Sequence, residues 1–225
     1  MHMTNNNRNP KSTRQADHRT ERAIDTFLNR FFYRKKFRRV ESVNDDTRQK
    51  EGIDTIADGM LIDNKAMSNP RYVNAPRPTY SLELLVYSSK RRSDYLGWFL
   101  NPQLLTTHYL FVWVVEAEVA AEEYITDSRQ IRRLEVMLVD RVALHQHIAK
   151  QCSDEKLLEY CRKVRRHNQP RLNIQEFGYG AGNPYLRYSD DYEESPCNLI
   201  VPKHVLKKFA SKHCFVTAKE VTDIS

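Results

Sequence analysis

The stretch that decides the fold is EGIDTIADGMLIDNK, which occupies residues 51–65. It consists of two strand-like runs around Asp58-Gly59, a dipeptide typical of the tight turn of a β-hairpin because both positions tolerate a positive φ. We therefore expect strands at residues 49–56 and 60–66, paired antiparallel through this turn. The hairpin then determines which polar side chains meet.

Two carboxylates and one amine come together on the predicted hairpin. Asp63 and Lys65 are two positions apart, so their side chains share one face of the strand, whereas Ile62 and Asn64 point to the other face. The turn also brings Asp54 roughly opposite Asp63, within reach of one shared ion. Hard carboxylate oxygens suit Mg²⁺ or Mn²⁺, whereas a zinc site would recruit histidines or cysteines. We therefore expect Mg²⁺ or Mn²⁺ as the cofactor.

A divalent ion beside a lysine is the minimum equipment for hydrolysing a phosphodiester with water. The reaction needs charge stabilisation on phosphorus, a nucleophile made from water and a proton for the leaving oxygen. Asp54 and Asp63 are the expected metal ligands. Lys65 is placed to position or help deprotonate the water and to offset charge on the phosphate.

An amphipathic helix is predicted upstream of the hairpin, at residues 20–35. Apolar side chains recur every four positions in two adjacent columns, which are Ala23, Phe27, Phe31 and Ile24, Leu28, Phe32. Glu21 lies at the edge of this apolar face, which makes it a candidate catalytic and metal-binding residue. The alternative is that Glu21 favours the first helical turn, where acidic side chains complement the helix dipole.

Glu83 is a further catalytic candidate on a later strand. In the run SLELL, residues 81–85, it alternates with leucines. It therefore either faces the same site, as a ligand or as a partner that holds Lys65, or is a solvated or salt-bridged strand residue.

The remaining pattern predicts the α/β class. Further strands are expected at residues 39–42, 80–88, 108–115, 134–139 and 198–201. Helices are expected at residues 143–151 and 154–166, with another that starts at Pro202. We expect a mixed central sheet flanked by helices.

One domain should hold all these elements. A disordered basic tail is predicted at residues 1–17, and a single domain at residues 18–225. Its core would cover about residues 20–140, with α+β additions over about residues 141–225.

Basic charge is concentrated near the start of the chain. The net charge is +7, and the first fifty residues hold all of this excess. Such asymmetry suits contact with a polyanion, although a basic tail also keeps proteins in solution. The candidate nucleic-acid-binding residues form two runs, Arg34, Lys35, Lys36, Arg38, Arg39 and Lys90, Arg91, Arg92. Trp98 and Phe99 follow the second run and either stack on bases or close the edge of the sheet.

Cysteine usage and hydropathy predict a cytoplasmic location. The four cysteines form no C-x-x-C pair, and the first residues lack the apolar core of a signal peptide. No stretch approaches the about 18 continuous apolar residues of a membrane span, so no membrane partner is expected.

The order of helix, Asp-bearing strand and Asp-x-Lys strand resembles the PD-(D/E)xK nuclease superfamily, which has the restriction-endonuclease-like fold. The resemblance implies that Asp54 matches the first acid of the motif, Asp63 the second and Lys65 its lysine. Glu21 would match the extra acid that many members carry on the first helix.

This resemblance spans about residues 20–115, and Ile53 stands where the motif has proline. Short segments are also similar to uncharacterised nuclease-like proteins of bacterial or phage genomes, namely Gly52-Ile53-Asp54, Ile62-Asp63-Asn64-Lys65, Ser81-Leu82-Glu83 and Gly97-Trp98-Phe99. A role in bacterial or phage defence, or in mobile-element biology, is therefore implied.

The leading hypothesis is a metal-dependent endonuclease that hydrolyses DNA phosphodiester bonds. DNA is preferred because the resembled superfamily mostly cuts DNA, and cutting both strands would make a homodimer natural. The alternative is a non-catalytic module that binds nucleic acid or a partner while retaining the fold. A third hypothesis is a structural protein whose exposed aromatic side chains dock a partner.

Overall fold

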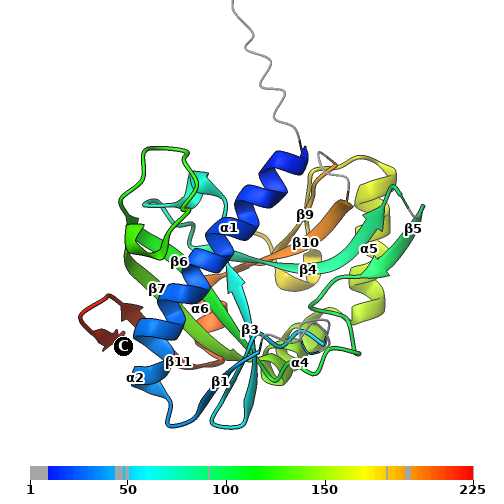
Figure 1. Cartoon of the computed structure of the whole chain (residues 1–225). Coiled ribbons are helices and arrows are strands. Elements are labelled where there is room, and N and C mark those ends of the chain that lie inside the picture. Colours follow the sequence, from blue (N-terminus) through cyan, green and yellow to red (C-terminus); the bar gives the residue numbers. More distant parts are fainter. Residues whose placement is uncertain are drawn as a thin grey trace, which may run out of the picture.

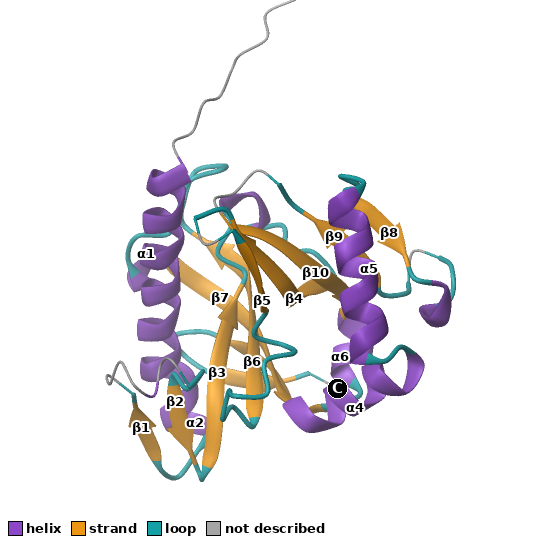
Figure 2. Ribbon diagram, turned by 90° about the vertical axis from the view of Figure 1, so that its right-hand side faces the viewer, coloured by secondary structure: helices purple, strands orange, loops and turns teal. Residues whose placement is uncertain are grey.

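The computed structural model describes residues 10–43, 48, 51–90, 92–180, 182–190 and 194–224. Within these residues the strands form one sheet of seven strands and one of five. The second sheet packs against one face of the first, and helices cover the two outer sides (Figures 1 and 2). The molecule is therefore layered as helix, sheet, sheet and helix.

The first sheet contains the predicted hairpin. In spatial order its strands are β1 Val40–Ser42, β2 Thr55–Ala57, β3 Met60–Ala66, β6 His108–Ala117, β7 Ile131–Asp140, β11 Ala210–Val216 and β12 Val221–Asp223. β3 and β6 run parallel and the other neighbours antiparallel, so the sheet is mixed. Asp58 and Gly59 have φ values of 47° and 84°. The turn thus adopts the positive-φ geometry that favours this dipeptide in hairpins.

The second sheet is antiparallel throughout and combines distant parts of the chain. In spatial order its strands are β5 Ser93–Leu96, β4 Thr79–Ser88, β10 Glu194–Pro202, β9 Tyr185–Tyr188 and β8 Arg171–Asn173. β4 and β5 lie within the connection between β3 and β6. The other three strands come from the last third of the chain, so β10 must cross back to pair with β4.

β6 forms the boundary between two hydrophobic cores. Its residues 110, 112 and 114 are buried toward α1, and its residues 109, 111 and 113 are buried toward the second sheet. The ring of Tyr80, on β4, lies 4.5 Å from the ring of Phe111 and 5.5 Å from that of Trp113 between centroids. An apolar strand buried on both faces is expected at the centre of a layered α/β protein.

α1, Pro10–Leu28, covers the outer face of the first sheet (Figure 2). It continues through one turn of π-helix, Asn29–Tyr33, into α2, Arg34–Lys36. The wider π turn rotates the buried face. Tyr33 is therefore fully buried while Phe31, which the every-fourth pattern placed in the core, is only partly covered.

The remaining helices pack on the other side of the molecule. They are α4 Arg141–Gln151, α5 Asp154–Arg166 and α6 Lys203–Lys207. α5 is capped at its start by Ser153, whose hydroxyl accepts from the backbone N–H of Lys156 at 3.4 Å. Leu157 and Cys161 of this helix are buried in the core that it shares with the second sheet.

The predicted α/β class, with a mixed sheet flanked by helices, is confirmed. The strand at residues 60–66 and the helix at residues 154–166 have the predicted bounds. Of the strand expected at residues 49–56, residues 49 and 50 lie outside the described part, and the prediction is wrong for residues 51–54, because β2 begins only at Thr55 and Asp54 precedes it in a loop.

Two further expectations differ from the structure. α1 begins at Pro10, within the stretch predicted as a disordered tail, although residues 1–9 lie outside the described part. The C-terminal region also does more than add to a finished core, because β10 pairs with β4 and β11 pairs with β7. Both sheets are completed by residues after position 190. Among the helices of the described residues, none is long and apolar enough to cross a membrane.

Phe27→Ala tests the packing of α1 on the first sheet. Phe27 is 1% exposed in this core. We expect the substitution to lower the free energy of unfolding by about 3–5 kcal/mol, since it removes buried area and leaves a cavity. Urea denaturation measures the change. Arg22→Ala, on the exposed side of the same helix, should stay within about 0.5 kcal/mol, and equal effects of the two substitutions would contradict the packing.

Candidate active site

A cavity of about 670 Å³ lies between α1, the end of the hairpin and the second sheet. Four acids and one cation line one side of it, namely Glu21, Asp25, Asp54, Asp63 and Lys65. The structure thus brings together the predicted residues of the helix, of β3 and of the loop before β2. Asp25 was not predicted.

The cavity exists because β2 is shorter than β3. β2 pairs with β3 only as far as Thr55 opposite Ile62, so the later part of β3 has a free edge on this side. The loop before β2 supplies the next contacts. The backbone N–H of Asp54 donates to the carbonyl of Ile62 at 2.9 Å, and Asp54 Oδ2 accepts from the backbone N–H of Asn64 at 2.7 Å. The carboxylate of Asp54 therefore occupies the edge of β3 where a longer β2 would have continued to pair.

Asp63 and Lys65 share one face of β3, as their spacing predicts. Lys65 Nζ lies 2.8 Å from Asp63 Oδ2, and it also lies 4.7 Å from the centroid of the Trp98 ring. The ion pair is short, but its direction falls outside hydrogen-bonding geometry, so Oδ2 accepts no hydrogen bond from the described residues. Burial raises the pKa of Asp63 to about 7; Lys65 opposes this shift, and the Asp54 charge adds to it.

Asn64 points to the opposite face and ties β3 to α1. Its Nδ2 donates to Asp25 Oδ1 at 3.1 Å, and its Oδ1 accepts from the Tyr33 hydroxyl at 2.5 Å. Burial, followed by the charge of Asp54, raises the pKa of Asp25 to about 7. One sequence feature could have indicated Asp25: it follows Glu21 by four positions and therefore lies on the same side of the helix.

Glu21 also lines the cavity, as one of its two interpretations required. Its Oε2 lies 3.1 Å from His18 Nδ1, one turn earlier. Burial and the charge of Glu21 raise the pKa of Asp17 to about 6. Acidic side chains thus continue along α1 from Glu21 to Asp17, which lies outside the cavity lining.

Glu83 is close to Lys65 but is not among the residues that line the cavity. Burial raises its pKa, while the Lys65 charge and a hydrogen bond from the Trp98 backbone oppose that shift. Of its two predicted roles in the site, that of a partner for Lys65 fits this position better than that of a metal ligand.

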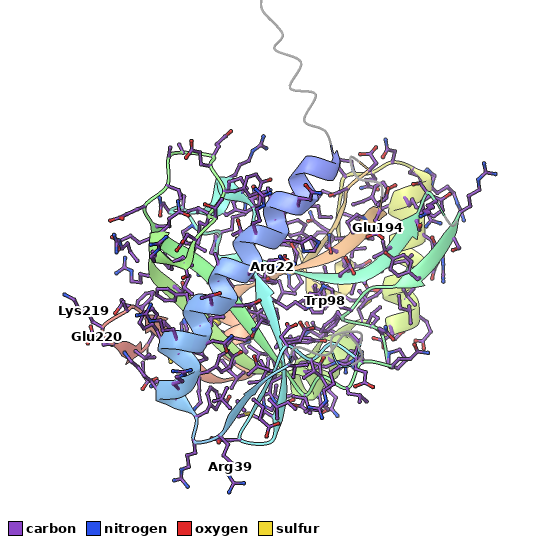
Figure 3. All side chains as sticks on the ribbon, in the orientation of Figure 1. Arg22, Arg39, Trp98, Glu194, Lys219 and Glu220 are labelled. Carbon is purple, nitrogen blue, oxygen red and sulfur yellow. The ribbon has the colours of Figure 1, made fainter. Side chains whose placement is uncertain are left out.

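The structure does not bring the first basic run to the cavity. Lys36 Nζ lies 2.8 Å from Asp223 Oδ1, and Lys35 Nζ donates to the carbonyl of Lys219 at 2.8 Å. These contacts hold α2 against the C-terminal hairpin, which consists of β11 and β12. Figure 3 shows Arg39 at the lower tip of the molecule and Trp98 near its middle. Of the run's other members, Arg34 and Arg38 are also absent from the cavity lining.

The second basic run stands at the tip of the β4–β5 hairpin. Lys90 and Arg92 are exposed there, and neither lines the cavity. Arg91 lies outside the described residues. The two basic runs are therefore separate surfaces rather than parts of the candidate site.

A half-buried arginine, Arg141, fixes the loop that contacts the segment before Asp54. Arg141 Nη1 donates to the carbonyl of Leu104 at 2.6 Å, and its Nη2 donates to the carbonyl of Asn101 at 2.7 Å. Thr106, in the same loop, donates its hydroxyl to the carbonyl of Gly52 at 2.5 Å. This chain of contacts positions the turn that leads to Asp54.

A comparison with known protein families, with curated proteins and with solved structures finds no match to this chain. The interpretation of the site therefore depends on its own geometry and chemistry.

The raised pKa values of Asp25 and Asp63 predict how stability depends on pH. Both are raised from 3.8 to about 7 in the folded protein, so folding favours their protonated forms. This stabilisation is complete below pH 3.8 and is lost as the pH rises through 7. We expect metal-free protein to unfold at a lower temperature at pH 8 than at pH 5.

Asp25→Asn, which mimics the protonated acid, should weaken this pH dependence and raise stability at pH 8 by about 1–2 kcal/mol. Thermal unfolding from pH 5 to pH 8 measures both effects. Glu159→Gln, at an exposed position of α5, serves as the control. If the unfolding temperature of Asp25→Asn depends on pH in the same way as that of the control, the raised pKa of Asp25 is contradicted.

Gly52→Ala tests the loop before Asp54. Gly52 has a φ of 76°, and a Cβ there would lie 2.7 Å from Thr106 Oγ1. Gly59 has a φ of 84° with no atom within 4 Å of its added Cβ, so Gly59→Ala isolates the backbone cost. We expect a loss of about 1–3 kcal/mol for Gly52→Ala and a smaller loss for Gly59→Ala in urea denaturation. Equal losses would contradict the steric contact.

Proposed function

We propose that this chain is a metal-dependent nuclease of the PD-(D/E)xK type, with a restriction-endonuclease-like arrangement, that hydrolyses phosphodiester bonds in DNA. The observation that carries the proposal is the cavity that gathers Asp63 and Lys65 of β3 with Asp54 of the loop before β2. The acid of the preceding helix, Glu21, lines the same cavity.

The acidic side of the cavity fits a divalent cation. Asp63 Oδ2 is buried 2.8 Å from Lys65 Nζ, in a direction that falls outside hydrogen-bonding geometry, and its carboxyl lies beside that of Asp54. Two adjoining carboxylates repel one another unless a proton or a cation lies between them. Asp54 and Asp63 are therefore the residues that would hold Mg²⁺ or Mn²⁺. The ion, when bound, would polarise a phosphate oxygen and lower the pKa of water.

The number of ligands also agrees with Mg²⁺ chemistry. Within the described ranges, no three His, Cys, Asp or Glu side chains are arranged to hold a metal together. Zinc and calcium sites made wholly of protein need such groups. Mg²⁺ commonly takes only one or two carboxylates and completes its shell with water and substrate phosphate. Two acids are thus consistent with a Mg²⁺ site whose remaining ligands are water and substrate phosphate.

Lys65 has the position of the group that meets the phosphate. Its ammonium lies 2.8 Å from Asp63 and against the Trp98 ring, so its direction is fixed from two sides. A compact ammonium can offset the charge that develops on a phosphate and can orient the attacking water. Asp25, with a pKa raised to about 7, is suited to accept a proton near neutral pH.

Substitution of the hairpin residues tests the activity. We expect wild-type protein to nick or degrade DNA with Mg²⁺ or Mn²⁺ and to lose this activity with a chelator. Asp63→Asn and Lys65→Ala should each lower the rate about 10²- to 10⁴-fold, since each removes a group that acts on the reacting phosphate or water. Gel assays on plasmid and oligonucleotide DNA measure the rates.

Glu159→Gln is the matched control, and thermal unfolding shows whether each variant remains folded. Undiminished cutting by both folded hairpin variants would overturn the proposal.

A second candidate function is a non-catalytic module that binds nucleic acid. The observation that favours it is the second basic run, since Lys90 and Arg92 are exposed at the tip of the β4–β5 hairpin and lie outside the cavity lining. Such a module would bind DNA with a steep salt dependence that Mg²⁺ does not change. Binding without cleavage in the assay above would support this alternative.

A further inference from the structure

We infer that the cavity holds an unpaired nucleotide, so that the substrate is single-stranded DNA rather than continuous duplex. This inference rests on the proposed function and specifies its substrate class. It comes from the other residues that line the cavity. Tyr72, Ser81, Trp98 and Asn198 belong to this lining and come from four separate segments of the chain.

The depth of Asp63 excludes a simple surface encounter. Asp63 is only 4% exposed, so a phosphate must enter the cavity to reach it. Residues of α1 and of the second sheet both line this cavity, and Figure 2 shows these elements on opposite sides of β3. The volume of about 670 Å³ lies within the range of sites that enclose a small-molecule-sized group. A base inside a duplex would have to leave its stack to enter such a space.

Two aromatic rings of the cavity are already held in place. The Trp98 ring packs edge-on against Tyr109, with 4.9 Å between centroids. The Arg77 guanidinium lies 4.3 Å from the centroid of the Tyr72 ring. Rings held in this way lose little conformational freedom when a base stacks on them. Stacking on aromatic side chains is the usual source of affinity for single strands.

Two polar side chains beside the rings remain available. Among the described residues, no hydrogen-bond partner contacts the side chains of Ser81 or Asn198. The amide of Asn198 offers both donors and an acceptor, and the hydroxyl of Ser81 offers one of each. Such groups match the edge of an unpaired base, which carries donors and acceptors that pairing would conceal.

The charges of the cavity favour the same conclusion. Proteins that bind duplex DNA gain most of their affinity by neutralising phosphates with many lysines and arginines. Here Lys65 is the one Lys or Arg among the described residues that line the cavity, and four acids stand beside it. Affinity must therefore come from the metal and from stacking, and stacking requires an exposed base face.

Equilibrium binding tests the inference without requiring cleavage. The protein is the full chain carrying Asp63→Asn, in Mg²⁺ at a fixed salt concentration. The probes are a fluorescein-labelled 12-nucleotide DNA of mixed sequence, the same DNA as a duplex and the same sequence as RNA. Fluorescence anisotropy should show single-stranded DNA bound at least about 10-fold more tightly than the duplex.

Tyr72→Ala and Asn198→Ala, each added to this protein, should weaken single-strand binding about 5- to 100-fold and leave duplex binding unchanged. Tyr72→Phe should keep the affinity, because it keeps the stacking face. Tyr179→Ala is the matched control, since Tyr179 is 73% exposed and lies outside the cavity lining. Thermal unfolding checks that the variants are folded.

The outcomes separate this inference from the proposed function. Equal or tighter binding of the duplex or of RNA, or an effect of Tyr72→Ala no larger than that of Tyr179→Ala, overturns the inference. A further assay uses the chain with Tyr72→Ala as its one substitution, so that Asp63 is intact. If this variant cuts duplex DNA as fast as the wild-type protein does, the inference is overturned while the nuclease function stands. Tyr72-dependent binding of single strands by a chain that cleaves nothing supports the nucleotide site and rejects the nuclease.

Discussion

Asn64 makes the set of contacts on which the candidate site depends. Its backbone N–H is bound by Asp54, and its side chain joins Asp25 to the Tyr33 hydroxyl. One residue therefore connects the free edge of β3 with the preceding loop and with α1. Because Asp63 and Lys65 flank Asn64 on the same strand, the relative positions of Asp25, Asp54 and Asp63 depend on how this strand is held.

The sequence predicts the local part of this arrangement well. Asp58-Gly59 fixes the hairpin, strand alternation places Asp63 beside Lys65, and the register then brings Asp54 near them. These features depend on spacings of a few residues, where backbone geometry alone decides the outcome.

The parts that were missed depend on packing between distant segments. A strand pattern does not specify which strand lies beside it, so the second sheet and the contribution of Asn198 were not predicted. The π turn rotates the end of α1, which brings Tyr33 to Asn64 where an ideal helix would have placed a neighbouring residue. The basic charges of α2 looked like a nucleic-acid surface, yet Lys35 and Lys36 contact the C-terminal hairpin.

The pairing of β4 with β10 has a consequence for biosynthesis. The acids and Lys65 leave the ribosome early, but Asn198 on the opposite side of the cavity is translated more than a hundred residues later. A nascent chain can form the hairpin long before it can close the second sheet, since non-local strands pair late. Products terminated before Asn198 would carry the carboxylates without an enclosing wall, so the complete cavity requires synthesis through β10.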